Sequence, residues 1–270
     1  MIIGLLGKTF WLYICDIWDE ARDMNKSSGY VSSKFVNYTL FEMGLNIELD
    51  HYETYCVRME SVLEEEKQRL QFDMEQESAN LSGYEKANHH DEFFTSYQYK
   101  LVTDVFPDIQ RKSGLISLYA MAEKKLSEIC GMYEKKGGYP LMRSDLKNGK
   151  VLEKVERYLS KVVQIDFPRK RGLWKEIKMI RQLRNKCVHC NGIVSPGNKG
   201  LVKYINESDF LDERRGLLFQ TVLPDQYEPF QIKIKQGYLE NCISVFKEFF
   251  KELFVELEKM NKPKLQIVKR

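Results

Sequence analysis

Arg184, Asn185 and His189 are the residues of this chain whose types and spacing best suit chemistry on a phosphodiester. A guanidinium has a planar fork that can hold two phosphate oxygens at once. Histidine is the only one of the three side chains that titrates near neutral pH, so His189 is the candidate general acid or base. The amide of Asn185 would orient the histidine or the phosphate.

The segment that leads to these residues is strongly basic. Between Arg169 and Lys186 there are eight basic residues and one acidic residue, which gives a net charge of +7. Between Glu42 and Glu92 there are 14 acidic residues against four basic ones, a net charge of −10. A positive surface favours polyanions through counterion release, although a solvated helix face produces the same kind of charge run.

Helical spacing places Arg184 on the apolar side of this segment. At about 100° per residue it shares one face with apolar residues, namely Leu173, Ile177, Ile180 and Cys187. A charge in that position is costly unless an anion pairs with it. The anion could come from a neighbouring helix, with Glu123 as a candidate, from a partner subunit, or from a ligand phosphate.

Arg184 and His189 do not face the same point on an ideal helix, because five residues correspond to a net rotation of about 140°. The two side chains can converge only if the helix distorts near its C-terminal end, or if the site forms across a symmetric dimer.

The sequence Arg184-Asn185-Lys186-Cys187-Val188-His189 resembles the R-x(4–6)-H motif of the HEPN family, in the form that has a polar residue directly after the arginine. The resemblance covers roughly residues 90–260. It implies a compact α-helical domain whose motif helices face each other around a two-fold axis in a homodimer, and a metal-independent endoribonuclease without cofactors. It also points to a toxin-like or antiphage defence effector that cleaves tRNA or other RNA, with an antitoxin or sensor protein as a candidate partner.

The resemblance also assigns roles to side chains. Arg184, Asn185 and His189 would be catalytic, and the RNA 2′-OH would attack its own phosphate. Contacts to the RNA backbone would come from the nearby cations, namely Lys175, Lys178, Arg181 and Lys186.

Apolar periodicity predicts an all-α protein, mainly a helical bundle, with a small β-ribbon inserted between the motif helix and the last helix. We expect an N-terminal helical extension over 1–88, a HEPN-like domain over 89–262 with the β-prone insert at about 200–235, and a basic tail over 263–270. The extension contains a first helix near the N-terminus and a long acidic helix that reaches about Ala79. That acidic helix could shield the basic segment or dock a partner.

Several individual helices are predicted from their apolar stripes. One helix should end near Pro107, and another should bury Val155, Leu159 and Val162. The two clearest stripes comprise Leu115, Tyr119, Ala122, Leu126, Ile129 and Tyr133, and then Leu239, Cys242, Phe246, Phe249, Leu253 and Leu257.

The six scattered cysteines do not form a secreted disulfide framework, which favours a reducing cytoplasmic location. Cys187 and Cys190 have the spacing of zinc ligands, but the other cysteines supply no second pair at matching spacing, so we expect no metal. The apolar N-terminus resembles neither a signal peptide nor a membrane span, and we expect no membrane contact.

Two other function classes remain open. A non-catalytic HEPN-like module would dimerise and bind RNA or a nucleotide without cleaving it. A purely structural helical protein would satisfy Arg184 with an internal carboxylate and would bind no RNA.

Overall fold

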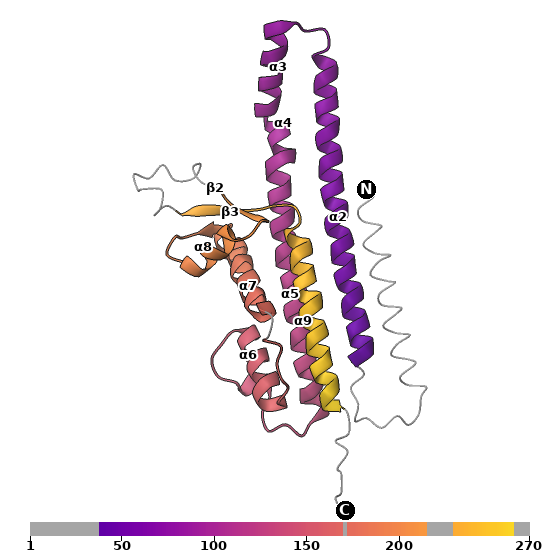
Figure 1. Cartoon of the computed structure of the whole chain (residues 1–270), viewed down its shortest axis with the longest axis vertical. Coiled ribbons are helices and arrows are strands. Elements are labelled where there is room, and N and C mark those ends of the chain that lie inside the picture. The colour runs from indigo at the N-terminus through magenta and orange to yellow at the C-terminus, as the bar shows by residue number, and fades with distance from the viewer. Residues whose placement is uncertain (1–37, 170–171, 215–228, 262–270) are drawn as a thin grey trace, which may run out of the picture. The chain divides into compact units, whose positions relative to one another are not determined.

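The computed structural model describes residues 38–169, 172–214 and 229–261, and these residues are mainly helical with one small sheet (Figure 1). The predicted fold class is therefore confirmed. The expected first helix and the tail over 263–270 lie outside the described residues. None of the described helices combines the length and the apolar character that crossing a membrane requires.

A long helical hairpin occupies the N-terminal part of the described chain. Its first arm is α2 (Tyr38–Glu77), and its second arm runs through α3 (Gly83–Thr95), α4 (Tyr97–Lys100), η1 (Leu101–Val105) and α5 (Phe106–Lys136). The predicted helix end near Pro107 is wrong. Pro107 occupies the first turn of α5, where a missing N–H costs little, and the π-helical segment η1 carries the chain into it.

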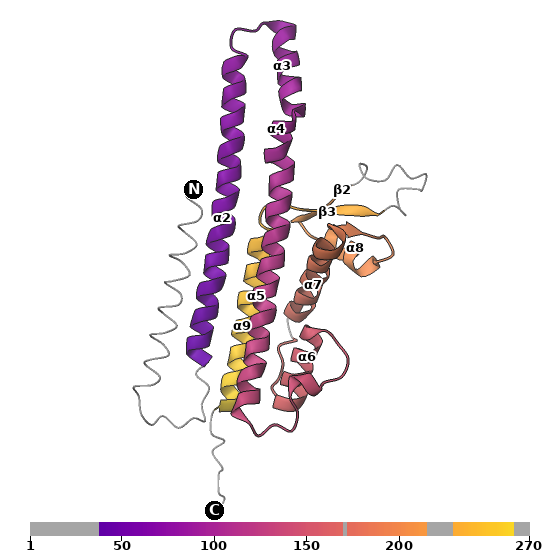
Figure 2. The same cartoon turned by 180° about the vertical axis from the view of Figure 1, so that it is seen from behind.

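Helix α5 forms the centre of the molecule, and all six residues of its predicted apolar stripe are buried. The helix ends at Gly137, which adopts a left-handed φ of 73° that glycine tolerates best. All six residues of the predicted stripe on α9 (Tyr238–Asn261) are buried as well. Helix α9 lies beside α5, so the two stripes form much of the core (Figures 1 and 2).

The segment after α5 contains η2 (Arg143–Asp145), α6 (Val151–Arg157) and the π-helical η3 (Tyr158–Val163). Val155 and Leu159 are buried as predicted, but the next buried residue is Val163 rather than Val162. A π-helical turn contains one extra residue, which moves the apolar face on by one position.

The motif helix is α7 (Leu173–Cys190), and the insert follows it. The insert contains β1 (Ile193–Val194), the unpredicted α8 (Lys199–Asn206), β2 (Leu211–Arg214) and β3 (Phe230–Ile234). The strands form an antiparallel sheet in the order β1-β3-β2, with Val194 opposite Phe230 and Leu211 opposite Ile234. A further β-compatible run within 215–228 lies outside the described residues.

Helix α2 packs against α5 and α9, and it buries Leu45, Leu49 and Cys56 in doing so. It lies on the opposite side of α5 from α7 in both views (Figures 1 and 2). Its ion pairs to α5 and α9 join Glu60 to Arg111 and Glu48 to Lys125 on α5, and Asp50 and Glu53 to Lys247 on α9. The hypothesis that this acidic helix shields the motif helix is therefore wrong. The domain boundary expected at residue 88 falls within α3 and stays a prediction.

Candidate nucleic-acid site on the motif helix

Helix α7 is fixed by its apolar face and by its C-terminal end. The residues it buries are Leu173, Trp174, Ile177, Ile180, Leu183 and Cys187. Asn191 has a left-handed φ of 48°, and Gly192 donates its N–H to the carbonyl of Lys186 at 2.9 Å. The buried Lys112 of α5 pairs with Asp108 at 2.8 Å and reaches the Asn191 carbonyl at 3.4 Å. A cation at a helix C-terminus is favourable, so α5 stabilises the end of α7 that carries the motif.

Arg184 is half-buried and contacts the helix opposite. Its guanidinium carbon lies 5.2 Å from the centre of the Tyr119 ring, within the range of a cation–π interaction. Its Nη1 donates a hydrogen bond to Oδ1 of Asn185 at 3.0 Å, so the amide orients the arginine. Its Nε is buried without a hydrogen-bond partner among the described residues. No described carboxylate lies within ion-pair distance of this guanidinium.

Glu123, the candidate internal partner of Arg184, makes a different contact. It accepts a hydrogen bond of 3.4 Å from the Tyr119 hydroxyl. Burial and the Glu123 carboxylate raise the pKa of Tyr119, although Arg181 and Arg184 act in the opposite direction. Tyr119 therefore stays neutral at physiological pH and offers Arg184 the face of an uncharged ring.

Arg181 lies one turn before Arg184 and is neutralised. Its Nη1 is 2.6 Å from Oε1 of Glu153 on α6, and only 15% of its side chain is exposed. Glu156, also on α6, accepts contacts from three donors: Arg169 at 2.7 Å, the Trp174 indole N–H at 2.9 Å and Lys178 at 3.5 Å. Lys178 also lies over the Trp174 ring. Two of the four cations expected to contact RNA are thus ion-paired within the chain.

The other two expected RNA contacts, Lys175 and Lys186, have no ion pair with any carboxylate in the described part of the chain. Lys175 is exposed near the start of α7 and Lys186 is half-buried near its end. His189 is exposed on the last turn, and none of the described side chains is within hydrogen-bond distance of its ring. The positive charge that remains unpaired on α7 is therefore concentrated toward its C-terminal end.

The structure brings Arg184 and Asn185 together but places His189 elsewhere on the helix. Helix α7 stays α-helical as far as Cys190, so no distortion rotates His189 toward Arg184. Of the two ways in which these side chains could converge, only the meeting of two copies of the helix remains.

The carboxylates of α6 are the feature that sequence reasoning missed. Glu153 and Glu156 are three residues apart, as are Lys178 and Arg181, so each pair occupies one face of its helix. This matched spacing of opposite charges on consecutive helices is a signal that could have revealed the pairing.

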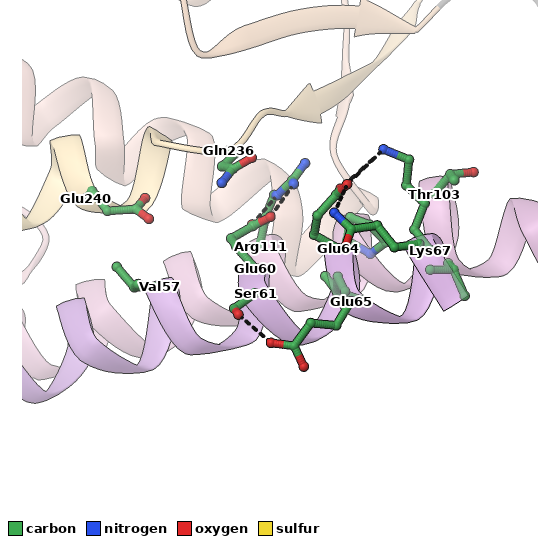
Figure 3. A pocket seen from close by; sticks show the side chains of 14 residues that line it. Val57, Glu60, Ser61, Glu64, Glu65, Lys67, Thr103, Arg111, Gln236 and Glu240 are labelled. Carbon is green, nitrogen blue, oxygen red and sulfur yellow. Dashed lines mark hydrogen bonds and ion pairs between the residues drawn. The ribbon is translucent and has the colours of Figure 1, made fainter. Parts of the chain in front are cut away.

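A pocket of about 640 Å³ lies elsewhere, between α2, the start of α5 and the turn before α9 (Figure 3). Its charged groups are largely paired with one another. Arg111 holds Glu60 with two contacts of 2.7 Å, and Lys67 contacts Glu64 at 3.2 Å. Because its cations are already neutralised, this pocket is poorly suited to a polyanion.

No protein-family model, curated protein or solved structure matches this chain.

Cys187 is buried, which raises its pKa to about 11, whereas Cys190 is exposed. Among the described residues no group of three or more histidine, cysteine, aspartate or glutamate side chains could hold a metal ion.

Proposed function

We propose that the protein is a cytoplasmic, metal-independent endoribonuclease of HEPN type that acts as a toxin-like or antiphage defence effector on tRNA or other cellular RNA. The R-x4-H motif supplies the proposal, and an antitoxin or sensor protein would control the activity. The main structural support for this proposal is the environment of the Arg184 side chain. Its guanidinium is half-buried, oriented by Asn185 and Tyr119, and unpaired with any described carboxylate.

A phosphate would complete the surroundings of this arginine. A partly desolvated cation gains from an anion, and the guanidinium fork can hold two oxygens of the scissile phosphate. The same contact becomes stronger as negative charge builds up on the pentacoordinate phosphorus, which is how a fixed donor accelerates a reaction.

The proposed reaction is an internal transfer. A histidine takes the proton of the RNA 2′-OH as the 2′ oxygen forms a bond to phosphorus, and the bond from phosphorus to the 5′ oxygen breaks. A second histidine gives a proton to that leaving oxygen. The products are a 2′,3′-cyclic phosphate and a 5′-hydroxyl, and DNA is not cleaved because it lacks the nucleophile.

Two copies of the chain fit this chemistry better than one. A single α7 presents its arginine and its histidine on different faces, whereas two such helices around a two-fold axis could place both arginines and both histidines in one cleft. His189 of each copy would then act on a phosphate held by Arg184 of the other.

One observation favours the alternative, a non-catalytic HEPN-like module that dimerises and binds RNA or a nucleotide. Catalytic histidines are commonly oriented by a second hydrogen bond. No described residue makes such a bond to His189. The module would need only the positive charge of Arg184 and Lys186, and it would bind RNA without breaking it.

The test is incubation of the purified full-length protein with a tRNA pool and total RNA in EDTA, with analysis of the 3′ ends for cyclic phosphate. We expect wild type to cleave and both Arg184→Ala and His189→Ala to be inactive. Arg181→Ala is the matched control, since it removes a neighbouring arginine that is already paired. Intact RNA with retained binding would support the module instead, and cleavage that survives both substitutions would overturn the proposed site.

A further inference from the structure

The two carboxylates of α6 occupy cations that a polyanion would otherwise contact. Glu153 pairs with Arg181, while Glu156 contacts Lys178 of the motif helix and Arg169 just before it (2.6, 3.5 and 2.7 Å). Lys178 and Arg181 lie on α7 within two turns before Arg184, and Arg169 precedes the helix in the sequence. The carboxylates thus hold the same donors that would bind successive phosphates of an RNA strand.

In the pairs of Glu156 with Arg169 and of Glu153 with Arg181 one partner is largely buried, although Arg169 itself is half-exposed. Only 16% of the Glu156 side chain and 15% of the Arg181 side chain is exposed. Glu156 is further fixed by the hydrogen bond from Trp174, whose indole is itself buried. Burial is the largest single influence and raises the pKa of both glutamates, but the lowering influences together outweigh it: Arg181 and backbone hydrogen bonds at Glu153, and Arg169, Trp174 and Lys178 at Glu156. Each pKa is therefore lowered. Both carboxylates therefore stay ionised at neutral pH.

The helix that carries the carboxylates is anchored in the core. Leu152, Val155, Tyr158, Leu159 and Val163 of α6 and η3 are all at most 1% exposed. Because α6 cannot leave without exposing these side chains, an RNA phosphate that approaches the three cations competes with carboxylates that are held in place.

We propose that Glu153 and Glu156 act as built-in competitors of RNA phosphate that keep a strand from the middle turns of α7 and from Arg169 just before the helix. This inference rests on the proposed function, since it concerns how the same site takes RNA. The carboxylates compete for Arg169, Lys178 and Arg181, and the strand is held mainly by the cations of α7 that have no such partner, namely Arg184, Lys186 and Lys175. The enzyme would then require a well-placed substrate and would not bind every single strand tightly.

The effect of removing the competitors can be estimated. For single strands, log K falls with log salt by about 0.7 for each phosphate contact, which amounts to about five-fold in affinity per contact between 1 M and 0.1 M salt. Releasing all three cations should therefore tighten binding about 125-fold at 0.1 M salt and make the slope steeper by about 2.1.

The experiment compares full-length wild type with Glu153→Gln/Glu156→Gln, using a short labelled 2′-O-methyl RNA that cannot be cleaved. Fluorescence anisotropy at salt concentrations from about 0.05 to 0.2 M gives both affinity and slope. The matched control is Glu64→Gln/Glu65→Gln on α2, which removes two negative charges from the opposite side of α5. Adding Arg181→Ala to the first variant should cancel part of its gain.

Tighter binding with a steeper slope in the α6 variant alone supports the proposal. Equal gains in the α6 and α2 variants would overturn it, because they would reflect net charge only. If wild type binds but the α6 variant binds no better, the inference fails while the proposed function stands. If neither wild type nor any variant binds RNA at low salt, the proposed function itself fails. Glu153→Gln alone leaves the Trp174–Glu156 contact intact, and it repeats the test if the double variant does not fold.

Discussion

The middle turns and the last turns of the motif helix have the same kind of side chains in opposite electrostatic states. In the middle turns, Arg181 and Lys178 are paired with carboxylates of α6. In the last two turns, Arg184 faces an aromatic ring and an amide, and no described carboxylate pairs with it. Because Arg181 and Arg184 are only one turn apart on the same helix, the neighbouring helix must be the source of this difference.

This difference in pairing indicates a structural role for Arg181 and a candidate functional role for Arg184. A buried cation with a carboxylate partner has its charge satisfied within the fold. A half-buried cation without such a partner has an incomplete environment that a ligand can complete. The comparison thus gives a physical reason to select Arg184 from a segment that contains eight basic residues.

The largest expected effect is the difference in RNA cleavage rate between Arg184→Ala and Arg181→Ala. We expect Arg184→Ala to lower the rate of RNA cleavage by about 10²- to 10³-fold, because a fixed donor to the developing charge is lost. Arg181→Ala should change the rate only slightly, since its charge is already neutralised by Glu153. Single-turnover cleavage of a tRNA substrate measures both effects, and equal losses in the two variants would contradict the assignment.

Mixing two inactive variants tests whether the active site is formed by one subunit or by two. We expect Arg184→Ala and His189→Ala subunits to regain part of the wild-type activity when they are combined, because a mixed dimer places one intact arginine opposite one intact histidine. Activity as a function of mixing ratio, with each variant alone as the control, measures this recovery. A mixture as inactive as its components, under conditions where mixed dimers are detected, would contradict a shared site in which one arginine and one histidine are enough for cleavage.

The sequence predicted the helices more accurately than their charge partners. The stripes of α5 and α9 follow a regular period, and all the residues predicted for these two stripes are buried. Errors arose where the period itself changes, as at the π-helical turns that carry the chain into Pro107 and move burial from Val162 to Val163. Helix α8 was missed because its eight residues lie within a segment of β-prone character.

For the candidate site, the face of Arg184 was predictable and its partner was not. Helical spacing placed the arginine on the apolar side of α7, and it is half-buried there. Which carboxylate approaches a given cation depends on the crossing of α6, α5 and α7, and a linear pattern does not encode that crossing. Sequence reasoning therefore assigned Lys178 and Arg181 to RNA and considered Glu123 for Arg184, whereas Glu153 and Glu156 pair with the first two.

Replacing Arg181 should lower stability more than replacing Arg184, which is the reverse of the order expected for activity. Arg181→Met leaves Glu153 without its partner in a partly buried position, and we expect it to cost about 1–2 kcal/mol of unfolding free energy. Arg184→Met removes a half-buried charge that no described carboxylate pairs with, so its cost should be close to zero. Urea unfolding at neutral pH measures both values, and a large loss in the Arg184 variant would indicate an internal partner and favour a purely structural role.

The smallest expected effect is the pH dependence of the α6 pairs. Because the pKa values of Glu153 and Glu156 are lowered from 4.5 in the folded state, their contribution to stability is complete above that value. It is lost as the pH falls through the lower folded values, since the unfolded chain then binds more protons than the folded one. Glu153→Gln/Glu156→Gln should therefore lose less stability than wild type between neutral pH and about pH 3.5, by about 1 kcal/mol or less after solvent screening.

Urea titrations of both proteins at several pH values measure this difference, and Glu64→Gln/Glu65→Gln on α2 is the matched control. Glu64 also has a lowered pKa, from its hydrogen bonds with Lys67 and Gln68, but it is fully solvated and should contribute little. If wild type and the α6 variant lose stability in parallel on acidification, the α6 pairs are no stronger than surface contacts. RNA could then displace them easily, and the middle turns of α7 would be as available to a phosphate as the last turns.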